Sequence, residues 1–184
     1  MGLVVVTEGQ AEAHLVKELA RREGAEARVV YLPGRSMAVS HACKLLVSTD
    51  DAVLLLVDAD VPPADAARSR YQTEHLLATV APAARWRVEQ FVPEFEALFF
   101  EARQVLTKHY GEVSLVQQAK AEYDPKRVLE ELAAGAPDRP QSVADLVARL
   151  DPEDIAALRG TTSADRIVEA FQQLSDANSR RPAA

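Results

Sequence analysis

The arrangement of hydrophobic and polar residues along the chain predicts alternating strands and helices in its first part. Four short apolar runs have the length of strands: residues 3–7, 27–32, 53–57 and 86–92. Four longer segments carry apolar residues at helical spacing: residues 11–23, 36–47, 64–80 and 94–110. This alternation is typical of right-handed βαβ units. We therefore expect an α/β, Rossmann-like fold with a mainly parallel four-stranded sheet flanked by helices.

The residue pattern changes beyond residue 111, where the sequence contains no run of β-branched residues typical of a strand. Five further segments favour helix: residues 113–121, 125–134, 142–150, 152–158 and 163–174. We predict an α/β domain at residues 1–111 and a C-terminal helical appendage at residues 112–177 packed on it. Residues 178–184 are expected to form a disordered tail.

The apolar run at residues 53–57 leads directly into Asp58 and Asp60. A strand without alternation is typically buried on both faces of a parallel sheet, and open α/β sheets bind ligands at the carboxyl ends of such strands. In an extended backbone, residues two apart point to the same side, so the two carboxylates should converge. Two close carboxylates favour a divalent cation with oxygen ligands, Mg²⁺ or Mn²⁺. The alternative is a strand end that turns into solvent through Pro62 and Pro63.

A second candidate lies at the end of the first strand, where Glu8 precedes Gly9. Glycine permits a sharp turn there and the close approach of a phosphate, and the following helix directs its N-terminus to the same place. Because parallel strands end at one edge, Glu8 should join Asp58 and Asp60 in a group of three carboxylates.

Composition narrows the functional classes. The formal net charge is −7, so no global basic field attracts nucleic acid, although a metal-dependent active site is itself acidic. The single cysteine, Cys43, excludes an intrachain disulfide framework and a thiolate zinc cluster. No apolar run is long enough to span a membrane and no secretory leader is evident, so we expect a cytoplasmic protein without membrane contact.

Together these motifs resemble the TOPRIM domain, the metal-binding domain of topoisomerases, primases and OLD-family nucleases. The resemblance rests on Glu-Gly-x-x-Glu at residues 8–12 and on Asp-x-Asp at residues 58–60, about fifty residues later. Residues 91–100 also resemble the "E-A-W-L-L" segment of small stand-alone OLD-like proteins. The resemblance covers residues 1–110, with a weaker similarity in the helical tail.

The resemblance implies roles for individual residues. Glu8 matches the catalytic or metal-binding glutamate, and the other metal-binding positions fall on Asp58, Asp60, Glu96 and Glu12. Acidic residues in a first helical turn are favoured without any ligand, which is the alternative for Glu12 and Glu96, and we favour Glu96 over Glu94. Gly9 and Lys126 are candidates for contact with substrate phosphate. The family's later aspartate is Ala102 here, and Glu101 need not replace it because one residue rotates a helical side chain by about 100°.

The activity that the resemblance implies is Mg²⁺-dependent phosphotransfer on nucleic acid, as an endonuclease. A topoisomerase or a primase would need a further large domain, which we do not expect here. A second interpretation is a metal-binding module with weak or no activity that acts with a partner protein, such as an ATPase or an antitoxin-like protein. A third is a nucleotide-sugar transferase, whose Asp-x-Asp motif also holds metal and diphosphate, although such folds are usually longer and would leave Glu8 unexplained.

Overall fold

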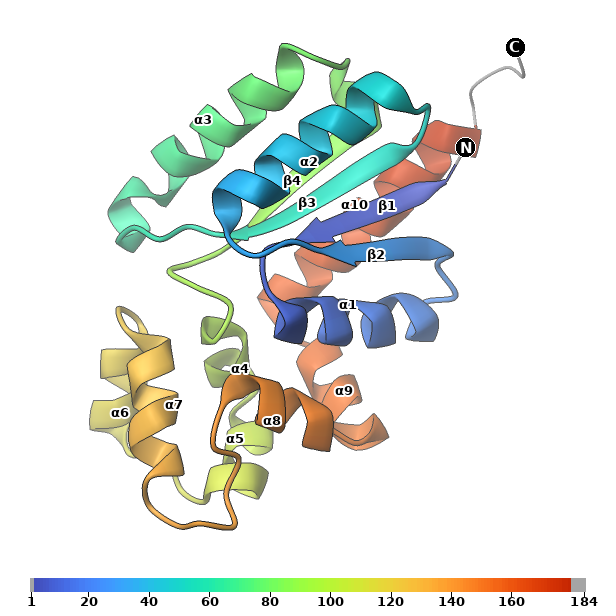
Figure 1. Cartoon of the computed structure of the whole chain (residues 1–184). Helices are drawn as coiled ribbons and strands as arrows, with labels where there is room; N and C mark the ends of the chain where they lie inside the picture. The colour runs from blue at the N-terminus through green and yellow to red at the C-terminus, as the bar shows by residue number, and fades with distance from the viewer. Residues whose placement is uncertain (1, 180–184) are drawn as a thin grey trace.

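The computed structural model in Figure 1 describes residues 2–179 and is built around a sheet of four parallel strands. The strand order is β2-β1-β3-β4, and all three pairings are parallel. The strands are β1 (Leu3–Thr7), β2 (Ala27–Tyr31), β3 (Ala52–Asp58) and β4 (Trp86–Phe91). The predicted α/β fold with a parallel four-stranded sheet is confirmed. The carboxyl ends of all four strands lie at one edge.

Helices cover both faces of the sheet, which explains the uninterrupted apolar run of β3. Leu54 and Leu56 face one core, to which α1 (Gln10–Arg22) and α10 (Thr162–Ser179) contribute. Val53, Leu55 and Val57 face a second core. That core is covered by α2 (Arg35–Ser48) and α3 (Ala66–Ala78), and short 3₁₀ turns lie at Pro63–Asp65 and Ala83–Arg85.

A group of short helices lies below the carboxyl edge of the sheet in Figure 1. They are α4 (Ala97–Glu101), α5 (Arg103–Tyr110), α6 (Leu115–Ala121), α7 (Pro125–Ala133), α8 (Val143–Arg149) and α9 (Pro152–Arg159). Their buried residues are continuous with the core under α1 and α10. The last helix, α10, returns to the sheet and packs against β3 and β4. The predicted helical appendage therefore supplies part of the covering layer.

The helix predicted over residues 94–110 is wrong as a single element. The chain makes a turn through Glu94 and Glu96, forms α4, and breaks at Ala102, whose backbone lies at φ −100° and ψ 64°. The physical reason is burial: Leu98, Phe99 and Phe100 are all buried, and three consecutive residues cannot share one face of a helix. A break after them allows α5 to bury a separate face.

The tail predicted at residues 178–184 does not begin at residue 178. Residues 178 and 179 continue α10 instead of starting a tail, since no helix-breaking residue precedes them, and residues 180–184 lie outside the described part of the chain. None of the described helices combines the length and hydropathy needed to cross a membrane.

Candidate metal site at the carboxyl edge of the sheet

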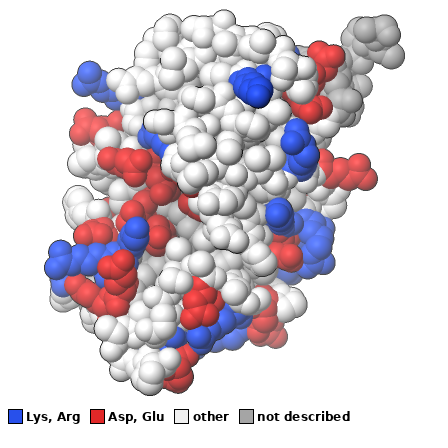
Figure 2. Space-filling model, viewed as in Figure 1, with Lys and Arg blue, Asp and Glu red and all other residues white. Residues whose placement is uncertain are grey.

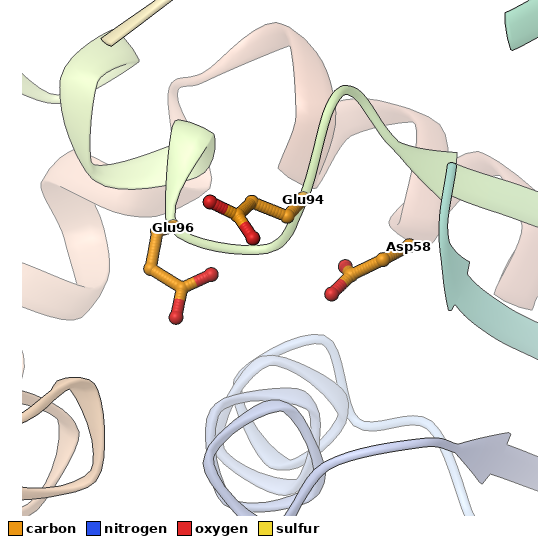
Figure 3. Close-up of side chains that lie close together, drawn as sticks. All are labelled: Asp58, Glu94 and Glu96. Carbon is orange, nitrogen blue, oxygen red and sulfur yellow. The ribbon is translucent and has the colours of Figure 1, made fainter. Parts of the chain in front are cut away.

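Three carboxylates converge where β3 and β4 end. Asp58 lies at the end of β3, and Glu94 and Glu96 lie in the turn between β4 and α4. One carboxylate oxygen from each of the three residues lies within 4.8 Å of the other two. Figure 3 shows the side chain of Asp58 directed toward the turn that carries the two glutamates. We call these three residues the acidic cluster.

Packing of aromatic rings fixes the turn that carries the two glutamates. Phe95 is 1% exposed, and its ring makes edge-to-face contacts with Phe91 and Phe99 at centroid distances of 5.1 and 5.5 Å. The backbone amide of Phe95 donates a hydrogen bond of 2.7 Å to Asp58 Oδ1. Because Phe95 is anchored in the core, Glu94 and Glu96 on either side of it must project at the edge of the sheet.

Glu8 and Glu12 complete the acidic edge from the side of β1 and α1. Glu8 Oε1 accepts a hydrogen bond from the backbone amide of Asp58. Glu12 is 8% exposed and its carboxylate folds back over Gly9, where a Cβ atom would lie 1.8 Å from Glu12 Oε2. A side chain at position 9 would therefore displace the Glu12 carboxylate, which occupies the space where we predicted that phosphate would approach Gly9.

Four carboxyl groups at this edge have raised pKa values: Glu8, Glu12, Asp58 and Glu96. Burial, followed by the charges of Glu8, Glu12 and Glu96, raises the pKa of Asp58 to about 9. Burial is also the largest cause for Glu8, whose pKa is about 7, and for Glu96, whose pKa is about 7. The pKa of Glu12 is raised by burial. Burial thus disfavours the ionised form of each group, and at Glu8, Asp58 and Glu96 the negative charges of neighbouring groups add to this effect.

The donor set fits a hard divalent cation. Mg²⁺ prefers oxygen ligands at about 2.0–2.1 Å, so two ligands on opposite sides of it are about 4.2 Å apart. The three oxygens of the acidic cluster lie within 4.8 Å of one another, so binding of Mg²⁺ or Mn²⁺ would draw them closer together. Among the described residues, Asp58, Glu94 and Glu96 are the set of acidic, histidine or cysteine side chains that meets this spacing.

Asp60 does not join the acidic cluster, which corrects the expected Asp-x-Asp pair. The strand ends at Asp58, and Asp60 has a left-handed backbone with φ 53°, so the alternation of an extended strand no longer applies. Backbone hydrogen bonds hold this bend, from Ala59 N to Phe91 O at 2.8 Å and from Asp60 N to Pro93 O at 3.1 Å. Asp60 instead lines a groove of about 530 Å³ between α2 and α3. Its charge still contributes to raising the pKa of Glu8.

Two residues at this edge were missed or ranked too low from the sequence. Glu94 belongs to the cluster as much as Glu96, and its Oε1 accepts a hydrogen bond of 3.0 Å from the amide of Lys126. Arg35 donates from Nη1 to the carbonyl oxygens of Asp58, at 2.8 Å, and Ala59, at 3.1 Å. The spacing of Glu94 and Glu96 around a buried aromatic residue was a usable signal, whereas nothing local in the sequence marks Arg35.

The remaining candidates lie around the cluster. The ammonium of Lys126 acts on Glu96 by its charge, lowering the pKa of that carboxyl against the larger effect of burial. Ala102 is buried, and Glu101 Oε2 accepts a hydrogen bond of 3.0 Å from the amide of Ser163 at the start of α10. Glu101 thus has a structural partner and does not replace the missing acid.

Acidic side chains gather on the face shown in Figure 2, where the carboxyl ends of the strands meet the helical part. Neither the protein family models, nor the characterised proteins, nor the solved structures with which the chain was compared match it. The geometry of the acidic edge is therefore the main indication of function.

Proposed function

We propose that the protein is a TOPRIM-like, Mg²⁺- or Mn²⁺-dependent phosphotransfer enzyme that cleaves phosphodiester bonds in nucleic acid. The observation that carries this proposal is the convergence of Asp58, Glu94 and Glu96, with Glu8 beside them, at the carboxyl edge of a parallel sheet. Ligands of open α/β sheets bind at this edge. The raised pKa values of Glu8, Asp58 and Glu96 support this proposal, because a bound cation would stabilise the ionised forms of these buried carboxyl groups.

The acidic cluster would hold the cation, which in such sites stabilises negative charge on a phosphate group. Glu8 is the candidate for proton transfer. One of its oxygens accepts the hydrogen bond from the Asp58 amide, which orients the carboxyl group. Its pKa of about 7 lets it exchange a proton near neutral pH, as a general acid or base requires.

A metal-binding module that needs a partner protein is the second candidate. Two observations favour it: the net charge is −7, and the nearby guanidinium of Arg35 is directed to backbone carbonyls. A partner such as an ATPase or an antitoxin-like protein would then supply the cationic surface for nucleic acid. The transferase interpretation is not favoured, because its metal site needs Asp60 beside Asp58.

Nicking of supercoiled plasmid DNA tests the proposal. The wild-type protein, Asp58→Asn and the control Asp60→Asn are incubated with Mg²⁺ or Mn²⁺, and metal binding is measured by calorimetry in the same buffers. Metal-dependent nicking that is lost in Asp58→Asn but kept in Asp60→Asn supports the enzyme. Metal binding without nicking supports the partner-dependent module, and no metal binding refutes both.

A further inference from the structure

A small cavity adjoins the acidic cluster on the side of the helical part. Its volume is about 120 Å³, and it lies between the start of α4, the end of α5, α7 and the segment before α8. The polar residues that line it are Glu96, Tyr110, Lys126, Glu130, Gln141 and Ser142. Glu96 belongs both to this cavity and to the acidic cluster, so a group bound in the cavity would lie next to the proposed cation.

Tyr110 is a buried residue of the cavity wall whose hydroxyl has no hydrogen-bond partner among the described residues. It is 2% exposed, yet its hydroxyl makes no hydrogen bond to any residue in the described part of the chain. Buried tyrosine hydroxyls usually have a partner, so a ligand in the cavity is the natural acceptor. Burial, and next the charge of Asp145, raise its pKa to about 12, which keeps the hydroxyl protonated as a donor at neutral pH.

The size of the cavity limits the ligand that it can hold. Its 120 Å³ correspond to about four water molecules at roughly 30 Å³ each, whereas pockets for drug-sized ligands start near about 300 Å³. A phosphate group fits this space and a nucleoside does not. The carboxylates of Glu96 and Glu130 also line the cavity, and its positive charge comes from the exposed ammonium of Lys126, which makes no ion pair with the described residues.

We propose that this cavity binds a terminal phosphate group of the substrate, through the Tyr110 hydroxyl and the Lys126 ammonium. A small space walled by several elements accommodates the end of a strand better than a backbone that continues through it. The inference rests on the proposed function, which it sharpens: the enzyme would act near a phosphorylated end.

Titration of inorganic phosphate into the full chain tests the cavity, with Mg²⁺ present and, separately, with EDTA. The variant Tyr110→Phe removes only the hydroxyl, and Tyr123→Phe makes the same change at a residue that is 71% exposed and outside the cavity. We expect phosphate affinity to fall about tenfold in Tyr110→Phe, as the loss of a hydrogen bond to a charged ligand implies. Lys126→Gln should weaken phosphate binding to a similar extent, and Tyr123→Phe should not change it.

Two further readings separate this inference from the proposed function. Mg²⁺ affinity without phosphate should be the same in wild type and Tyr110→Phe, and the melting temperature should not fall, because the hydroxyl has no partner to lose. An oligonucleotide with a terminal phosphate should bind more tightly than the same sequence without it, at the 5′ or the 3′ end.

If Mg²⁺ binds but phosphate does not, or if Tyr110→Phe binds phosphate like wild type, the cavity inference is overturned and the metal proposal stands. If Mg²⁺ does not bind, the metal proposal fails, and the EDTA titration decides the cavity alone.

Discussion

The carboxylate of Glu8, at the end of β1, accepts a hydrogen bond from the backbone amide of Asp58, at the end of β3. This contact joins two neighbouring strands at the edge where the acidic cluster lies. Asp58 is held on its other side by the amide of Phe95, which donates to its carboxylate. Two hydrogen bonds therefore hold Asp58, one to Glu8 after β1 and one from Phe95 after β4. We expect its position to be unchanged when the acids around it are replaced by isosteric amides.

Replacement of Asp58 should remove the metal site, whereas the same replacement at Asp60 should not. Asp58→Asn removes a carboxyl group that the cation would bind in its ionised form, so we expect Mn²⁺ affinity to fall by more than about 100-fold, beyond the effect typical of outer-sphere residues. Asp60→Asn lies outside the cluster and should change affinity by less than about threefold. Calorimetric titration with Mn²⁺ measures both. Equal losses in the two variants would show that the Asp-x-Asp pair acts together after all.

Glu8→Gln should separate catalysis from metal binding. The amide oxygen of glutamine can still accept the hydrogen bond from Asp58, but the side chain no longer takes up a proton. We expect the rate of metal-dependent DNA nicking to fall by about 10²- to 10⁴-fold, with Mn²⁺ affinity within about tenfold of wild type. A loss of Mn²⁺ binding instead would identify Glu8 as a ligand, and an unchanged rate would remove it from the chemistry.

The stability of the metal-free protein should fall as pH rises from 5 to 9. Carboxyl groups have pKa values near 4 in the unfolded chain. In the folded chain they are about 7 for Glu8 and Glu96 and about 9 for Asp58. The folded state therefore binds protons more tightly, and the stability contributed by these groups is fully present below pH about 4 and is lost as pH rises through their folded pKa values.

Urea unfolding in EDTA across this pH range measures the effect. The range stops at pH 5 because Asp151, whose pKa is lowered to about 2 by Lys108, loses its contribution at more acidic pH. Asp58→Asn should flatten the slope, and Asp60→Asn should retain it. Added Mg²⁺ should stabilise the protein more at pH 9 than at pH 6, since binding displaces protons. A stability that rises between pH 5 and 9 in EDTA would contradict the burial of these acids.

Much of the fold was predictable because hydrophobic patterns of β1 to β4 are local and strong. The acidic edge was predictable in part, since parallel strands must bring Glu8 and Asp58 to one side of the sheet. The position of Asp60 was not, because the rule for residues two apart holds only while the strand continues. Its left-handed backbone depends on hydrogen bonds to Phe91 and Pro93, which are distant in sequence. The break at Ala102 likewise reflects tertiary burial that helical periodicity does not encode.

Gly9→Ala should have opposite effects in two backgrounds. In wild type the new methyl group would displace the Glu12 carboxylate, which lies 1.8 Å from its position, so we expect a loss of about 1 kcal/mol in the free energy of unfolding. The backbone of Gly9, at φ −133° and ψ 155°, accepts alanine. With Glu12→Ala already present, the same change should therefore be neutral or stabilise by up to about 1 kcal/mol. Chemical denaturation of the four proteins in the cycle provides the test, and additive effects would rule out the contact.

Glu101→Ala should lower stability without affecting the metal site. The Glu101 carboxylate accepts hydrogen bonds from the amide and the hydroxyl of Ser163 in the first turn of α10, and removal of such a cap typically costs about 0.5–2 kcal/mol. Urea unfolding should show this loss, while Mn²⁺ affinity stays at the wild-type value. A weaker Mn²⁺ affinity would mean that Glu101 reaches the site in solution.

The hydrogen bond between Glu101 and Ser163 also suggests which part of this protein could change in sequence during evolution without disturbing the sheet. The chain leaves the sheet layer after α4 and returns at α10, and this contact holds the points of departure and return together. Tyr110, Lys126 and Ser142 all lie within the excursion, whereas Glu8, Asp58, Glu94 and Glu96 all precede it. If the proposals above hold, changes confined to the excursion would alter which substrate end is accepted, whereas the proposed cation ligands lie outside it, so selectivity and chemistry could evolve separately.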